Sequence, residues 1–216
     1  MKLRNRFMKA DNLRFISHLD LMRVIERAMR RGDIKFSLSK GFNPHPLISF
    51  GPALMLGATT HGDYFDVIIE DNLSPQEFKD RMNAVLPEGI YILDSYEVGE
   101  KDLLSQHVKE AEYIVKARLF GELKEIQNKI EAFMSKDKII IKKETKKGKK
   151  DIDLKPYILN FKYISTDEGW ILLYIKLTIA EGSPGPLYVI NAFNKFIGDK
   201  IDTETYRLDR KDLILD

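Results

Sequence analysis

Two histidines near the N-terminus, His18 and His45, have the clearest capacity for chemistry. A neutral histidine can accept or donate a proton near neutral pH, so either one could act as a general acid or base. His18 lies between Ser17 and Asp20, an order that also fits a helix start whose side chains satisfy free backbone N–H groups. We therefore treat His18 and His45 as candidate catalytic residues and keep the capping interpretation open beside them.

The same histidines could instead bind a metal ion. His18, His45 and His61 could act as ligands together with Asp20, but their spacing matches no zinc pattern. The chain contains no cysteine, which excludes disulfides, thiolate zinc sites, a cysteine nucleophile and an iron–sulfur cluster held by this chain. We expect no metal and no cofactor on the chain itself.

The loop with the sequence KGFNPHPLIS, residues 40–49, has an unusual composition. Its two prolines and one glycine exclude regular structure, and the restricted backbone loses less entropy on binding. Its aromatic side chain can stack on a base, and its polar side chains can form hydrogen bonds. We predict a binding loop, and a rigid crossover is the alternative. The candidate contact residues are Lys40, Phe42, Asn43, His45 and Ser49.

Two stretches of the chain are strongly basic. Helical spacing places most arginines of residues 23–31 on one face, where they could bind phosphate or form ordinary surface ion pairs. Residues 142–150 contain six lysines and predict a hairpin tip that contacts a phosphate backbone or is merely solvated. The candidates are Arg23, Arg27, Arg30 and Arg31 in the first stretch, and Lys142, Lys143, Lys146, Lys147, Lys149 and Lys150 in the second.

The net charge of +2 over 216 residues conceals a segregation of charge. Residues 1–50, 51–100, 101–150 and 151–216 carry net charges of +7, −8, +6 and −3. The positive blocks contain the two basic stretches, which favours either a basic face for a polyanion or a mixed solvated surface. No apolar run approaches the length of a membrane span, and no secretory signal is visible. We therefore expect a cytoplasmic protein.

Strand and helix signals follow a similar order in both halves of the chain. The first half predicts strands at 2–9, 35–39, 64–69 and 90–98, with helices at 17–31 and 74–86. The second half predicts strands at 113–119, 138–144, 158–163, 170–179 and 205–208, with helices near 123–133 and 186–197. The order β-α-β-β-α-β is the ferredoxin-like motif, an antiparallel sheet with its helices on one face. We predict an α+β fold of two tandem ferredoxin-like domains, 1–100 and 108–216. One α+β domain is the alternative.

Four segments of the chain carry a family resemblance. They are RFISHLDLMR at 14–23, SKGFNPHP at 39–46, ISFGPAL at 48–54 and DLKPYI at 153–158. In these segments the chain resembles the radical-SAM-linked family of bacterial proteins, whose members occur alone or fused behind a cobalamin-binding radical SAM protein. The resemblance implies a separately encoded radical SAM partner that holds the iron–sulfur cluster and S-adenosylmethionine. Genes of that family often lie near ribosomal-protein and ribonuclease genes, which implies RNA or a ribosomal component as a further partner.

These observations together predict a non-catalytic binding module that presents RNA or a ribonucleoprotein to a radical SAM enzyme. Two alternatives stay open. The tandem ferredoxin-like layout is similar to that of the CRISPR repeat-processing ribonucleases, which implies a metal-independent endoribonuclease that uses His18 or His45. The chain could instead be a purely protein-binding adaptor that contacts its partner through residues 43–49.

Overall fold

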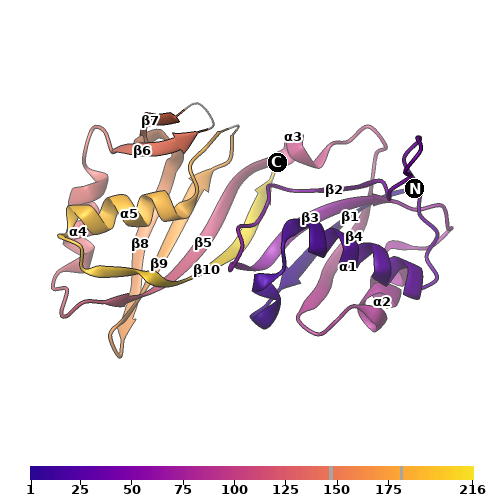
Figure 1. The fold of residues 1–216 in the computed structure, drawn as a ribbon, viewed down its shortest axis with the longest axis horizontal. Coiled ribbons are helices and arrows are strands. Elements are labelled where there is room, and N and C mark those ends of the chain that lie inside the picture. The colour runs from indigo at the N-terminus through magenta and orange to yellow at the C-terminus, as the bar shows by residue number, and fades with distance from the viewer. Residues whose placement is uncertain (146–147, 181) are drawn as a thin grey trace. The chain divides into compact units, whose positions relative to one another are not determined.

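The computed structural model describes residues 1–145, 148–180 and 182–216, which form two compact units. The first unit contains Met1–Val108 and Arg210–Asp216, and the second contains Lys109–Asp209. Both combine helices with antiparallel strands, so the predicted α+β class is confirmed (Figure 1). The predicted ranges, 1–100 and 108–216, give the whole C-terminus to the second domain. In the structure the last strand runs on into the first unit, because its final residues pair there.

The first unit places its strands in the order β4-β1-β3, and β2 also pairs with β3. Its elements are β1 (Lys2–Lys9), η1 (Asp11–Phe15), α1 (His18–Arg31), β2 (Ile48–Phe50), β3 (Thr59–Ile68), α2 (Pro75–Val85), β4 (Ile90–Val98) and α3 (Leu104–His107). The strand predicted at 35–39 is wrong, since the described residues of that segment form isolated bridges at Phe36 and Leu38. Leu38 pairs with Pro46, and a proline has no N–H with which to continue a ladder.

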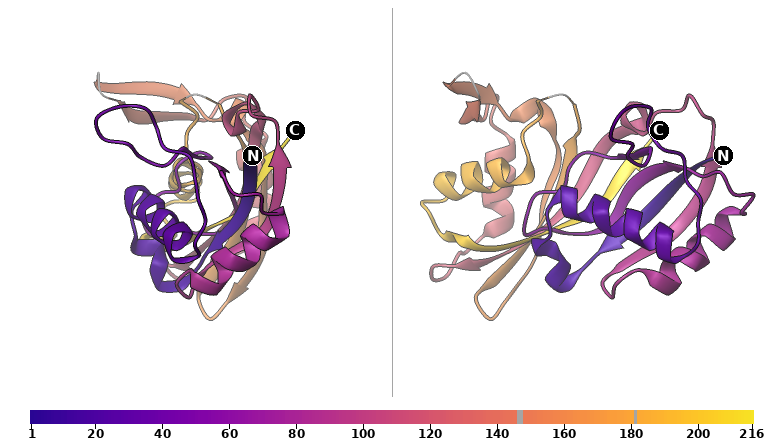
Figure 2. Two further views of the ribbon diagram at one scale, coloured as in Figure 1. Left: turned by 90° about the vertical axis from the view of Figure 1, so that its right-hand side faces the viewer. Right: turned by 45° about the vertical axis from the view of Figure 1, so that its right-hand side comes forward.

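The core of the first unit lies between the sheet and the two longer helices, which Figure 2 shows side by side. Helical spacing gives α1 an apolar stripe, of which Ile25 and Met29 are buried together with Leu3 and Phe7 of β1. The predicted start of α2 is confirmed. Ser74 caps the helix, and a capping box links it with a glutamate in the first turn.

Charged side chains on the other face of β1 are also buried. Arg4 forms a bidentate pair with Asp66, with Nε–Oδ1 and Nη2–Oδ2 distances of 2.9 and 3.0 Å. Asp102, which precedes α3, accepts a further hydrogen bond of 2.7 Å from Arg4. On the last strand, Arg210 forms a similar pair with Asp63 of β3. Removal of one partner of such a buried ion pair strongly destabilises the fold.

The second unit has the strand order β10-β5-β9-β8. Its elements are β5 (Val108–Leu119), α4 (Ile126–Met134), β6 (Ile140–Thr145), β7 (Gly148–Asp153), η2 (Lys155–Tyr157), β8 (Ile158–Asp167), β9 (Trp170–Thr178), α5 (Pro186–Phe196) and β10 (Ile201–Leu215). The strand predicted at 138–144 forms as β6, but it pairs with β7 in a separate hairpin. The last strand is longer than the predicted 205–208, because pairing extends it at both ends.

The helices of the second unit pack on one face of its sheet. Phe133 of α4 and Phe193 of α5 lie with ring centroids 5.4 Å apart, and both contact Phe161 of β8. These aromatic contacts form the centre of the core. Within the described ranges, no helix combines the length and the apolar composition that a membrane span requires.

Candidate nucleic-acid interface

The start of α1 has the geometry of a capped helix. Ser17 Oγ accepts a hydrogen bond of 3.1 Å from the backbone N–H of Asp20 and donates one of 2.7 Å to its carboxylate. The hydrogen bond from Ser17, with an ion pair to Arg23 at 3.1 Å, holds the pKa of Asp20 below its usual range. The ring of His18 packs edge-on against Phe50 with centroids 5.1 Å apart. The contacts of Asp20 with Ser17 and Arg23 account for its presence in the cap of the helix.

The remaining arginines of α1 differ in their partners. Arg30 forms an ion pair of 2.9 Å with Glu26, and Arg31 donates a hydrogen bond of 2.6 Å to the carbonyl of Val85. Arg27 is exposed and forms no ion pair within the residues that the structure describes. Local pairing therefore accounts for most of the basic face, and Arg27 is the arginine best placed to meet an anion.

A clamp between Ser39 and His45 closes the loop that contains both prolines. The N–H of Ser39 donates to the carbonyl of His45 at 2.8 Å, and the N–H of His45 donates to Ser39 Oγ at 3.1 Å. Ser39 Oγ also lies 2.9 Å from His45 Nδ1. The clamp leaves the side chain of Phe42 fully exposed, at 106%. The other predicted contact residues of this loop are exposed as well: Lys40, Asn43 and Ser49.

A small cleft of about 170 Å³ lies between α1 and the end of this loop. It brings Arg23 and His45 together with Glu26, and apolar side chains complete the lining. Leu19 is one of these, and it is 64% exposed. A largely apolar cleft with one cation and one carboxylate suits a side chain of a protein partner better than a polyanion. Across the described chain, no group of three His, Asp or Glu side chains forms a metal site, so the site considered from His18, His45, His61 and Asp20 is not assembled.

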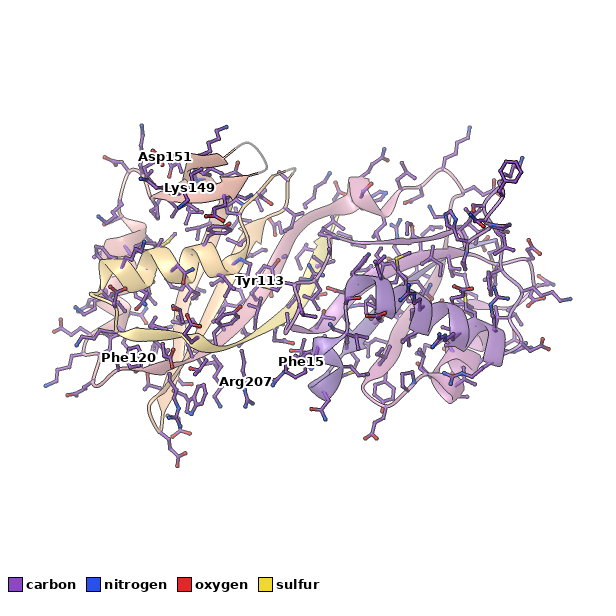
Figure 3. The ribbon with its side chains drawn as sticks, viewed as in Figure 1. Phe15, Tyr113, Phe120, Lys149, Asp151 and Arg207 are labelled. Carbon is purple, nitrogen blue, oxygen red and sulfur yellow. The ribbon has the colours of Figure 1, made fainter. Side chains whose placement is uncertain are left out.

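The lysine-rich stretch forms the β6–β7 hairpin, and its lysines have different surroundings. Lys143 donates a hydrogen bond of 2.7 Å to the carbonyl of Gly182 and thereby ties the hairpin to the turn before α5. Lys149 pairs with Glu144 across the hairpin at 3.6 Å. Figure 3 shows Lys149 and Asp151 on this hairpin. Lys142 and Lys150 are exposed, whereas Lys146 and Lys147 lie outside the described residues.

A larger cleft of about 720 Å³ lies between the hairpin, the end of α4 and α5. Among the residues that the structure describes, four lysines and one aspartate line it: Lys136, Lys138, Lys142, Lys195 and Asp151. None of these lysines forms an ion pair with another described residue. The cleft has the size of a typical ligand site and an excess of positive charge.

Aromatic rings and an amide share this cleft with the lysines. Lys136 Nζ lies 5.0 Å from the ring centroid of Phe196, whose side chain is 39% exposed. Tyr188, Asn191 and Lys195 follow helical spacing on α5 and face the cleft. Ammonium groups can bind phosphates by charge, and exposed rings can stack on bases. The arrangement is therefore suited to a nucleic acid.

The sequence indicated Lys142 but not the other cations of the cleft. Lys136 and Lys138 precede the lysine-rich stretch, and Lys195 is far from it in the chain. The feature of the sequence that could have indicated these cations is the spacing of Tyr188, Asn191 and Lys195, which places all three on one polar face of a helix. Only the docking of the hairpin against α5 shows that this face meets the lysines of the hairpin.

Comparison with known proteins gives a family and a fold. A family model described as uncharacterized protein conserved in bacteria (DUF2344) matches residues 2–187. No curated protein matches the chain. A chain in the crystal structure of a Cbf5-Nop10-Gar1 complex is similar in fold, with a TM-score of 0.52 at 10% identity over 95% of this chain. That similarity covers 47% of the other chain, so this protein spans about half of its length. An unknown protein from Galdieria sulphuraria aligns over 99% of this chain and 98% of its own at 12% identity, with a TM-score of 0.28.

Proposed function

This chain belongs to a bacterial family of uncharacterized proteins (DUF2344), and from that premise we propose that it binds RNA as the partner of a separate radical SAM enzyme. The lysine-lined cleft of the second unit is the observation that carries RNA binding. Its ammonium groups supply the charge that a phosphate backbone requires, and its rings supply stacking surfaces. The link to a radical SAM enzyme rests on the resemblance of residues 14–23 and 39–54, and the partner would hold the cluster and S-adenosylmethionine.

We also propose that each unit has the ferredoxin-like order. The order β4-β1-β3 with β2 on β3 supports this proposal for the first unit, and β10-β5-β9-β8 supports it for the second. In both, the two main helices lie on one face of the sheet, as Figures 1 and 2 show for each unit. In the second unit this arrangement leaves the opposite face of the sheet uncovered by the two main helices.

Removal of the cleft lysines is expected to weaken RNA binding and its dependence on salt. We predict that replacing Lys136, Lys138, Lys142 and Lys195 by alanine lowers the affinity for single-stranded RNA about tenfold or more at low salt. Each lost phosphate contact lowers the slope of log affinity against log salt by about 0.7, so the slope falls by up to about 3. Fluorescence anisotropy with a labelled RNA over a salt series measures both quantities.

A variant matched in charge provides the control for this experiment. Alanine at Lys101, Lys124, Lys129 and Lys200 removes the same formal charge away from the cleft and is expected to change the slope less. Equal losses in the two variants would show that net charge, not the cleft, binds RNA. Absence of binding by the unmodified protein at about 50 mM salt would contradict the proposal as a whole.

The first unit favours a protein partner as a second candidate function. Phe42 stands at the tip of a clamped loop, and the cleft beside α1 is largely apolar. Buried aromatic anchors often dominate the binding energy of protein interfaces. We propose that the radical SAM enzyme docks against this loop. The endoribonuclease alternative gains no support from the geometry, because His18 packs on Phe50 and His45 bonds to Ser39.

Replacing Phe42 by serine is expected to disrupt this docking. Loss of an interface anchor costs about 2 kcal/mol or more, so co-purification of the partner from the native host should fall about 30-fold. Quantitative mass spectrometry of the co-purified radical SAM enzyme measures this loss. Phe120→Ser, which alters a phenylalanine of the second unit that is 59% exposed, is the control. Full retention of the enzyme by Phe42→Ser would disprove docking through the loop.

A further inference from the structure

The face of the second sheet opposite α4 and α5 carries a second combination of aromatic and basic side chains. On β9, Ile171, Leu173 and Ile175 are buried on the helix side. The side chains that alternate with them, Trp170 and Tyr174 among them, are half-buried on the other side. Successive residues of a strand point to opposite faces, so these side chains share the face away from the helices.

Cross-strand pairing places two cations beside the tryptophan. Arg118 of β5 pairs in register with Trp170, and Lys116 pairs with Leu172. Lys116 Nζ and Arg118 Cζ lie 5.1 and 5.2 Å from the centroid of the Trp170 ring. In the described part of the chain, neither cation has a carboxylate partner. Both charges are therefore available to an anion that reaches this end of the sheet.

At the other end of the same face the cation is paired within the sheet. Lys176 forms ion pairs with Glu110 and Glu112 at 2.5 and 4.0 Å. Burial and a hydrogen bond to Glu112 raise the pKa of Tyr174 to about 12, so its phenol stays neutral. Asp167 of β8 stands opposite Trp170 and brings one carboxylate to the basic end.

We propose that this face binds single-stranded RNA by stacking an unpaired base on Trp170, with Lys116 and Arg118 at the flanking phosphates. The inference rests on the proposed RNA binding and names its substrate class. Four-stranded sheets whose exposed aromatic side chains stack bases are a common surface for single-stranded RNA. In the order β10-β5-β9-β8, the strands that carry these residues are the two central ones.

The cations resting on Trp170 do not block a base. Lys116 and Arg118 are exposed, and a cation–π contact at the protein surface is weaker than a stacked base, so the base can displace both long side chains from the ring. The ammonium and guanidinium groups then reach the phosphates on either side of that base. A duplex keeps its bases paired and stacked within the helix, so it cannot use the tryptophan in this way.

Trp170 is the only tryptophan of the chain, so tryptophan fluorescence reports on this site alone. We expect an oligouridine about ten nucleotides long to quench this fluorescence with the same midpoint as its binding measured by anisotropy. A duplex of the same length should leave the fluorescence unchanged. Trp170→Ala should weaken oligouridine binding at least about fivefold, whereas Trp170→Phe, which keeps a ring, should lose much less.

The outcomes separate this inference from the proposed function. Oligouridine binding that depends on the cleft lysines but leaves Trp170 fluorescence unchanged would overturn the inference and retain the function. Quenching with an unchanged midpoint in the cleft variant would retain the inference and remove the cleft from RNA binding. Absence of binding at about 50 mM salt would overturn both. Quenching in the unmodified protein decides the question even if Trp170→Ala fails to fold.

Discussion

Replacing Asp63 by alanine is expected to lower the free energy of unfolding by about 3–5 kcal/mol. Asp63 and Arg210 are 5% and 3% exposed, and their two hydrogen bonds measure 2.6 and 2.5 Å. Without Asp63 the guanidinium stays buried and loses the carboxylate that pairs with it through two hydrogen bonds. Burial also lowers the pKa of Lys9, and the charge of Asp63 opposes that shift, so the variant affects a second buried cation. Urea unfolding followed by circular dichroism measures the change.

Glu88→Ala is the matched control for this prediction. Glu88 is an exposed carboxylate of the same unit, and its removal should change the free energy of unfolding by no more than about 0.5 kcal/mol. Asp63→Asn keeps the shape of the side chain and loses its charge, so it should fall between the two variants. Equal stabilities for Asp63→Ala and Glu88→Ala would show that the buried pair contributes nothing to folding.

Replacing Phe133 by alanine is expected to cost the second unit about 3–5 kcal/mol. The side chain is 1% exposed, and its ring centroid lies 5.4, 5.6 and 6.0 Å from those of Phe193, Phe196 and Phe161. Truncation leaves a cavity where α4 and α5 meet the sheet, and the surrounding rings can fill it only in part. Urea unfolding followed by Trp170 fluorescence reports on this unit specifically.

The exposed Phe120 tests whether burial causes this effect. Phe120→Ala removes the same ring at a site that is 59% exposed, so its effect should stay within about 0.5 kcal/mol. If both variants lost similar stability, the aromatic cluster would not be the core of the unit. Phe133 also lines the lysine cleft, so Phe133→Leu, which preserves more volume, is the better variant for RNA binding.

Features set by neighbouring residues could be predicted from the sequence. The apolar spacing of Leu21, Ile25 and Met29 predicts the buried face of α1, because an α-helix repeats every 3.6 residues whatever surrounds it. Ser17 and Ser74 likewise cap helices through hydrogen bonds that span three residues. The α+β class follows from such local patterns, which is why it could be predicted.

Features that join distant segments required the tertiary structure. The lysine cleft combines Lys136, Lys142 and Lys195 from separate elements, and no spacing along the chain places them together. Arg118 and Lys116 meet Trp170 through the register of two strands. Strand pairing depends on hydrogen bonds between distant backbones, and charge interactions depend on distance in space. The sequence thus determined which helices form and which faces they bury, whereas the packing of distant strands decided where the free cations and exposed rings gather.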